Sequence, residues 1–488
     1  MEYIINKILM ILQENNISLY SFAKQTKINK STMHKLMHME RKLKPKYFYT
    51  IIDNLPASLS LKHELTNKYN RLSLGEKRYN ANLYILNMIN SFSEISFTIL
   101  NDKLSLPGQS QLNNPELAVI YKGDSAQHII NLLLIEEMHK RNSRAFVYMP
   151  GNSPALKSYI DNVVKLYNTD IKINFIIDII SSKEDDHEFY NLSVLKNILP
   201  IALSMNNNYN FYYTYINKPI DGSYLTPYPY FIALSDAIIW LNASADEALI
   251  INDATVVKNL ITRCEGKLAG YRKLLNSASD IINIVNTVVE NQPETGMHCC
   301  IEYEPCLAFY FTEEMIDSMV PAQIPNAQRN ELIKILNIRK IQLDNITKSI
   351  QLFNKNSLKE FAQTGIINEF PTAYSRPCTI EERQFLLTQL LNTTIDDSNE
   401  HLIRAVNPTN LEISDCLSLI IQDESCVQFT VFNDKKMPLK YLTIKEPTIG
   451  SYFKNFIMDS VDSNMVYSKE DTIDLIKEAL GAIPVNNK

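Results

Sequence analysis

The sequence predicts a multidomain protein in which a small N-terminal all-α domain precedes a large α/β body. The chain has 488 residues, which is too long for one ordinary core. Residues 1–74 carry apolar side chains at helical spacing, in short segments separated by breaks. From residue 116 onward, strand-like and helix-like segments alternate instead. The order of these two patterns along the chain predicts the order of the domains.

Five helices are expected within the first domain, residues 1–74. Their expected spans are 2–14, 19–25, 30–37, a helix that begins at Pro45 and is ended by Pro56, and 61–72. Ser18 and Asn29 are suited to cap the second and third helices, and Lys27 and Ile28 form a tight turn between them. A sixth helix at 76–92 and a loop at 105–115 form the connector, residues 75–115.

Two further domains are predicted in the body, an α/β domain at 116–290 and a mixed α/β domain at 301–488. Expected strands are 116–121, 145–149, 171–180, 210–216, 231–241, 417–422 and 427–432. Expected helices are 126–139, 155–167, 192–205, 254–275, 280–290, 325–348, 380–391, 449–459 and 469–482. Residues 230–240 and 411–421 both read as strand, Ser-Asp turn and strand, which raises the hypothesis of two related α/β halves.

The charge is divided unevenly along the chain. Residues 1–55 hold nine Lys and Arg against four acids, a balance of +5, so the other residues carry −11 of the total of −6. An apolar fraction of 45% with 21% charged residues is typical of a globular protein. Attraction to nucleic-acid phosphates is therefore expected at the N-terminal end, while the acidic body is repelled by them.

The second and third helices form a candidate DNA-reading unit. Apolar residues supply an inner face: Phe22, Ala23, Ile28, Met33, Leu36 and Leu43. Small Ala23 allows the two helices to cross closely. The outer face of the third helix offers side chains that can hydrogen-bond to base edges or phosphates, namely Lys30, Ser31, Thr32, His34 and Lys35. Arg41, Lys42, Lys44 and Lys46 follow where backbone phosphates would lie.

Residues 1–70 resemble the DNA-binding domain of the phage-repressor or XRE-type helix-turn-helix family. The matching segments are Phe22-Ala23, Ile28, Asn29 to Met33, Arg41-Lys42 and Ile51 to Leu55. The chain departs from the family at Lys27, where glycine is common, and at Met37, where glutamate is usual. The resemblance implies that Ser31, Thr32, His34 and Lys35 read bases and that Lys30, Arg41 and Lys42 lie near phosphates. A helical bundle used for protein contacts is the alternative.

No catalytic signature is recognised in the body. Nucleotide-binding glycine loops, nucleophile elbows and His-x-Lys phosphodiesterase motifs are missing from the sequence, so neither enzymatic activity nor a cofactor is expected. His298, Cys299, Cys300 and Cys306 raise the question of a metal site, but buried thiols are favoured because the spacing is not that of paired zinc ligands. The tyrosine-rich segment 209–215 either lines an effector pocket or forms an ordinary half-buried strand.

Together these patterns predict a sequence-specific transcriptional regulator that binds double-stranded DNA as a homodimer. The body is expected to bind an unknown small-molecule or protein effector, because DNA reading alone needs fewer than about 100 residues. A cytoplasmic location without a membrane is expected, since the N-terminus has no cleavable signal pattern. Two other classes stay open: a protein-interaction scaffold, and an enzyme that uses the helix-turn-helix for targeting.

Overall fold

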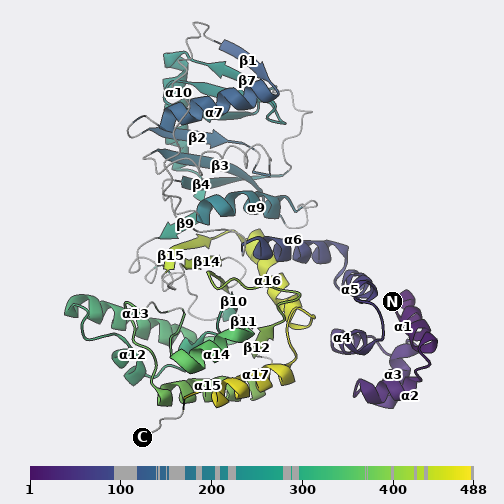
Figure 1. Ribbon diagram of the computed structural model, residues 1–488. Helices are drawn as coiled ribbons and strands as arrows, with labels where there is room; N and C mark the ends of the chain where they lie inside the picture. The colour runs from purple at the N-terminus through teal and green to yellow at the C-terminus, as the bar shows by residue number, and fades with distance from the viewer. Residues whose placement is uncertain are drawn as a thin grey trace.

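The fold has a helical head and a large α/β body that contains two mixed sheets (Figure 1). The computed structural model describes residues 1–92, 118–138, 140, 143–149, 151–152, 171–182, 189–203, 209–217, 227–278, 287, 296–368, 370, 372–396, 400–422, 426–432 and 438–484. The predicted multidomain architecture is therefore confirmed. The helices expected at 155–167 and 280–290, apart from residue 287, and the loop at 105–115 lie outside the described residues.

The head consists of five helices around a hydrophobic core of their own. The helices are α1 (Glu2–Glu14), α2 (Leu19–Gln25), α3 (Lys30–Met37), α4 (Pro45–Asn54) and α5 (Leu59–Leu74). The first three have the predicted bounds. The fifth is longer than predicted at both ends. It begins after Ser58, which caps it by accepting a hydrogen bond from the Leu61 amide at 3.3 Å, and it ends at Gly75, its C-cap residue.

Helix α6 (Glu76–Phe92) joins the head to the body. Gly75, with φ of 83°, separates it from α5. Apolar residues of α6 belong to the main core of the body: Ala81, Ile85, Met88 and Ile89. The helix packs against α9 (Tyr190–Leu203) and α16 (Pro447–Val461). The predicted connector helix is thus part of the body's packing.

The first half of the body is an eight-stranded sheet with the strand order β1-β7-β6-β5-β2-β3-β4-β8. Its strands are β1 (Ala118–Lys122), β2 (Arg144–Tyr148), β3 (Lys172–Ile180), β4 (Tyr209–Ile216), β5 (Tyr230–Ala233), β6 (Ile238–Leu241), β7 (Glu247–Ile251) and β8 (Arg272–Lys273). Helices α7 (Asp124–Met138), α9 and α10 (Ala254–Leu268) accompany the sheet.

The second half is a seven-stranded sheet with the order β12-β11-β10-β13-β14-β15-β9. Its strands are β9 (Leu275–Ala278), β10 (Gly296–Glu302), β11 (Ile346–Asn354), β12 (His401–Val406), β13 (Leu417–Gln422), β14 (Cys426–Phe432) and β15 (Pro438–Ile444). The helices are η1 (Leu307–Tyr310), α12 (Glu313–Met319), α13 (Asn326–Asp344), α14 (Lys355–Thr364), α15 (Ile380–Asp396), α16 and α17 (Lys469–Gly481). No helix in the described part of the chain is long and apolar enough to cross a membrane.

The two halves repeat one strand topology. In the first, β2, β3 and β4 are parallel, and β5, β6, β7 and β1 continue antiparallel from the other side of β2. In the second, β10, β11 and β12 are parallel, and β13, β14, β15 and β9 continue antiparallel from β10. Strands β1 to β7 therefore correspond to β9 to β15 in order. This correspondence confirms the hypothesis of two related halves.

The sequence match that first indicated a duplication is nevertheless out of register. Ser235 and Asp236 lie in the turn between β5 and β6, whereas Ser414 and Asp415 precede β13, the strand that corresponds to β5. The predicted strand 231–241 is therefore a hairpin. The predicted helix 254–275 ends at Leu268, and the predicted helix 325–348 ends at Asp344. In both cases the following apolar residues pair in β9 or β11 instead.

Candidate nucleic-acid interface

Helices α2 and α3 pack through the predicted inner face. All six of its residues are at most 9% exposed: Phe22, Ala23, Ile28, Met33, Leu36 and Leu43. Met37 is buried with them at 2% exposure, so at this position the chain adds an apolar contact to the core. The burial of one side of α3 fixes which side is left for a partner.

Side-chain caps fix both helix starts as predicted. The Ser18 hydroxyl accepts a hydrogen bond from the Ser21 amide at 3.1 Å, and the Asn29 Oδ1 accepts one from the Ser31 amide at 2.9 Å. Between the helices, Lys27 has a left-handed backbone with φ of 56°. Glycine adopts this conformation without the cost of about 1 kcal/mol that a Cβ brings. The departure at Lys27 therefore changes the side chain of the turn while the backbone keeps a glycine-like conformation.

The outer face of α3 is open to solvent. Lys30, Ser31, His34 and Lys35 are exposed, and Thr32 is partly buried. Arg41 lies beside this face, because its Nη1 donates to the Thr32 Oγ1 at 3.4 Å and its guanidinium lies 5.4 Å from the centre of the Tyr47 ring. The structure thus brings α3 and the following basic loop together.

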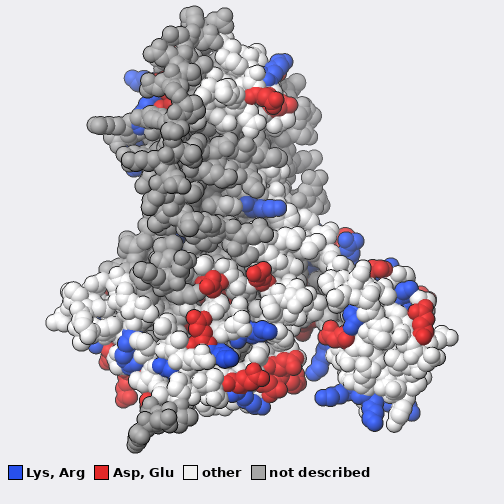
Figure 2. Space-filling model, in the orientation of Figure 1, with Lys and Arg blue, Asp and Glu red and all other residues white. Residues whose placement is uncertain are grey.

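The remaining predicted contacts, Lys42 and Lys44, are also exposed. Lys44 is the N-cap residue of α4, which places its side chain at the start of that helix. Figure 2 shows Lys and Arg side chains gathered at the lower edge of the head, over α2 and α3. We call the set of eight predicted DNA contacts the basic face: Lys30, Ser31, Thr32, His34, Lys35, Arg41, Lys42 and Lys44.

Tyr20 is a further candidate that was not predicted from the sequence. It lies near the start of α2 with 63% of its surface exposed, and the Lys30 Nζ lies 4.9 Å from the centre of its ring. A tyrosine hydroxyl can donate a hydrogen bond to a phosphate oxygen. Tyr20 lies two residues before Phe22, which places the two side chains on nearly opposite sides of α2, and this spacing was the available signal.

A partly exposed ion pair holds α6, the helix that follows the head, against α16 of the body. Arg78 of α6 donates two hydrogen bonds of 2.6 Å to the Asp459 carboxylate of α16, and the Asn82 Nδ2 donates a third at 2.7 Å. Asp459 is the more buried partner, with 14% of its side chain exposed against 41% for Arg78. A bidentate pair of this kind also fixes orientation.

We expect Arg78→Ala to loosen the packing of α6 on α16, because Asp459 keeps its charge but loses its cation. Hydrogen–deuterium exchange should become faster in α6 and in the C-terminal half of α16. Arg144→Ala is the matched control, since its pair with Glu265 is 60% and 44% exposed. Unchanged exchange at α6 in the Arg78 variant would contradict this role.

The cysteine cluster does not assemble in space. His298, Cys299 and Cys300 are consecutive on β10, so Cys299 faces away from its two neighbours. Cys299 packs in the main core and Cys306 in a second core. Among the described residues, no group of three or more His, Cys, Asp or Glu side chains is placed to hold a metal ion.

The tyrosine-rich strand β4 has the alternating burial of a half-buried strand, with Tyr209 and Tyr213 buried and Tyr212 partly exposed.

Asp178 lies on β3, the strand next to β4. It is fully buried and accepts a hydrogen bond from the Tyr148 hydroxyl at 3.1 Å. Burial raises the pKa of Asp178 to about 6, although the hydrogen bond from Tyr148 opposes the shift.

Because the folded pKa of Asp178 is raised, the folded protein binds this proton more tightly than the unfolded chain. Stability should therefore fall as the pH rises from about 4 to 6 and the carboxyl must ionise in the core. We expect Asp178→Asn to raise the Tm relative to wild type more at pH 7.5 than at pH 4.5. Asp317→Asn, an exposed change, should give the same small difference at both values. An Asp178→Asn difference that is independent of pH would contradict the raised pKa.

Comparisons with known proteins do not assign a family. No protein-family model and no curated protein sequence matches the chain. The solved structures to which the chain is similar include the following two, both at low scores. One is TrmBL2, an archaeal chromatin protein described with a novel mode of DNA binding, at a TM-score of 0.22 and 11% identity over 45% of this chain and 73% of that one. The other is polyphosphate kinase from Porphyromonas gingivalis, at a TM-score of 0.21 and 9% identity over 75% of this chain and 56% of that one. At these scores neither likeness carries an argument about function.

Proposed function

We propose that this protein is a sequence-specific DNA-binding transcriptional regulator. The observation that carries the proposal is the two-sided character of α3, which has a buried apolar side and an exposed side of Lys30, Ser31, His34 and Lys35. A short capped helix with this exposed side matches what the major groove accepts, and the groove is about 12 Å wide. The resemblance to XRE-type domains implies the same placement.

The basic face divides into two roles under this proposal. Ser31, Thr32, His34 and Lys35 contact base edges, and the surrounding cations bind phosphates on either side of the groove. Arg41 is positioned for this role by Thr32 and Tyr47, so less side-chain freedom is lost when it binds a phosphate. The acidic balance of the body supports binding through the head, because the rest of the chain is repelled by DNA.

We further propose that the protein acts as a homodimer that senses an effector through its body rather than as an enzyme. A single α3 covers only a few base pairs, and helix-turn-helix proteins gain length by binding two half-sites about 34 Å apart. The body holds α6 through Arg78 and Asp459, so a change in the body can alter the position of the head. That linkage supports effector control.

Genome-wide mapping of bound sites tests the proposal. Crosslinking and sequencing with the wild-type protein should give discrete sites that share a sequence with two-fold symmetry. The Lys35→Ala variant, expressed at the same level, should lose most of these sites. Uniform coverage of the genome by the wild-type protein would reject sequence-specific regulation.

A further inference from the structure

The C-terminal end of α3 carries two exposed histidines, His34 and His38. They are four residues apart, so they lie on one side of the helix, one turn from each other. The His38 amide donates to the His34 carbonyl at 3.0 Å, which keeps the helical spacing up to the C-cap residue. The ring centres are 4.1 Å apart, and the ring planes are inclined by 39°. The two imidazoles are therefore neighbours on an open surface.

Two imidazoles at this spacing can bind one metal ion. Neutral imidazole is the commonest metal ligand in proteins, and it suits zinc, copper and nickel. Zinc–nitrogen bonds are about 2.0–2.1 Å long, so two nitrogens on one ion lie about 3 Å apart. Rings whose centres are 4.1 Å apart reach this arrangement by rotation of the exposed side chains. Two histidines four residues apart on one helix face supply zinc ligands in a common class of metalloprotease.

The place of the pair at the end of the helix also favours a cation. The last carbonyl groups of a helix lack amide partners within it and carry a partial negative charge. His38 is the C-cap residue of α3, and His34 lies in its last turn, so both rings lie beside this end of the helix. The helix dipole therefore attracts the same ion that the two rings can bind.

The nearest cations of the basic face are engaged elsewhere. The Lys30 Nζ lies 4.9 Å from the centre of the Tyr20 ring, and the Arg41 Nη1 donates to the Thr32 Oγ1 at 3.4 Å. Lys35 is rotated by about 100° around the helix axis from the histidine that precedes it, so its side chain leaves the helix in another direction. These charges repel a metal ion, but the repulsion is limited because exposed charges are screened by salt.

We propose that His34 and His38 chelate one divalent transition-metal ion of the class that imidazole suits, with zinc, nickel and copper as its members. Water molecules complete the coordination, because the described part of the chain places no third His, Cys, Asp or Glu side chain with the pair. The ion lies on the exposed side of α3, within the surface that is proposed to enter the major groove.

The site rests on geometry alone, whereas its regulatory consequence rests on the proposed function. His34 is a predicted base-reading residue, so an ion on its ring removes a hydrogen-bonding nitrogen and occupies the space of a base edge. Metal binding should therefore weaken operator binding, and operator DNA should weaken metal binding by the same factor. His38 is not a predicted DNA contact, so its substitution separates the two activities.

Titration calorimetry of the full chain with ZnCl₂ tests the site without DNA. The measurement is made at pH 7.5, where ordinary imidazoles are mostly uncharged and free to bind a metal. His34→Gln and His38→Gln should each weaken zinc binding at this site by at least about tenfold, because the second ligand on one ion binds intramolecularly. His63→Gln is the matched control and should change nothing, since His63 is the single histidine of α5 and is exposed. MgCl₂ should not bind there, because magnesium prefers oxygen ligands.

Fluorescence anisotropy with an operator duplex selected from a random pool tests the consequence. Saturating zinc should weaken operator binding by the wild-type protein by about 5- to 150-fold, and it should leave binding by the His38→Gln variant unaltered. Zinc that leaves wild-type operator binding unchanged would overturn the regulatory role.

The metal site itself is overturned if zinc does not bind, if either variant of the pair binds zinc as tightly as the wild-type protein, or if His63→Gln loses zinc to the same extent. All three histidines are exposed, so none of these substitutions is expected to unfold the protein. The calorimetric measurement contains no DNA, so its failure leaves the DNA-binding proposal intact. Failure of DNA binding likewise leaves the calorimetric result unaffected.

Discussion

Lys35→Ala is expected to weaken binding to a selected operator duplex by about 1–3 kcal/mol, roughly 5- to 150-fold, while binding to unrelated duplexes changes little. Lys35 is exposed on α3 and is a predicted base-reading residue. Lys30→Ala should instead weaken binding to all sequences alike, because Lys30 is a predicted phosphate neighbour. The slope of log affinity against log salt concentration should become less steep by about one, which corresponds to one lost phosphate contact. Fluorescence anisotropy at several salt concentrations separates the two effects.

Lys68→Ala is the matched control for these variants. Lys68 is exposed on α5 and lies over the Tyr3 ring, outside the basic face, so this change removes the same charge from the head. Its effect should be confined to weak long-range electrostatics that are screened at physiological salt. If all three lysine variants weaken binding equally, α3 has no special role in recognition.

Phe48→Ala is expected to unfold the head and leave the body folded. The Phe48 side chain is fully buried, and its ring stacks on Tyr69 with centroids 3.8 Å apart and planes inclined by 7°. Removal of a buried phenyl ring costs about 3–5 kcal/mol, which is a large share of the stability of a five-helix domain. The head and the body have separate cores, so calorimetry should show loss of the head transition alone.

Phe385→Ala on α15 is the control for this prediction. Its side chain is 38% exposed, so the same truncation should cost much less. DNA binding should disappear in the Phe48 variant and persist in the Phe385 variant. A Phe48 variant that keeps a cooperative head transition would show that the stacked pair does not anchor α4 on α5.

The head was predicted closely from the sequence because its signals are local. Caps at Ser18 and Asn29 and the apolar spacing of short helices fix α2 and α3 within a few residues. The body was predicted less well. The apolar residues at the ends of the predicted helices 254–275 and 325–348 fit a helix or a strand equally, and only pairing with distant strands in β9 and β11 decides between them. The shared strand topology likewise emerges only from pairing.

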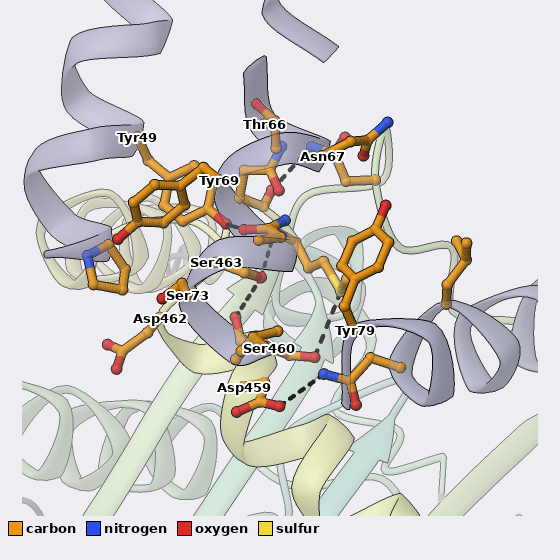
Figure 3. A pocket seen from close by; sticks show the side chains of 18 of the residues that line it. Tyr49, Thr66, Asn67, Tyr69, Ser73, Tyr79, Asp459, Ser460, Asp462 and Ser463 are labelled. Carbon is orange, nitrogen blue, oxygen red and sulfur yellow. Dashed lines mark hydrogen bonds between the residues drawn. The ribbon is translucent and has the colours of Figure 1, made fainter. Parts of the chain in front are cut away.

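The packing of α5 and α6 against residues 458–465 (Figure 3) had no signal in the sequence. The hydrogen bonds that join α6 to Asp459 span 377 and 381 residues, and no spacing rule relates segments so far apart. The pairing of Arg78 with Asp459 shows the same limit, because neither residue stands out from the many surface charges of the chain. By contrast, the eight predicted DNA contacts lie within fifteen residues of one another, and all but the partly buried Thr32 are exposed.

Competition binding at fixed salt tests the central claim most directly. The full chain is bound to a labelled duplex selected from a random pool and is then displaced by the unlabelled duplex or by a scrambled duplex of the same composition. We predict that the scrambled duplex competes at least about 1,000-fold less well, as is typical of specific DNA recognition. Equal competition by the two duplexes would contradict the claim that α3 reads a DNA sequence.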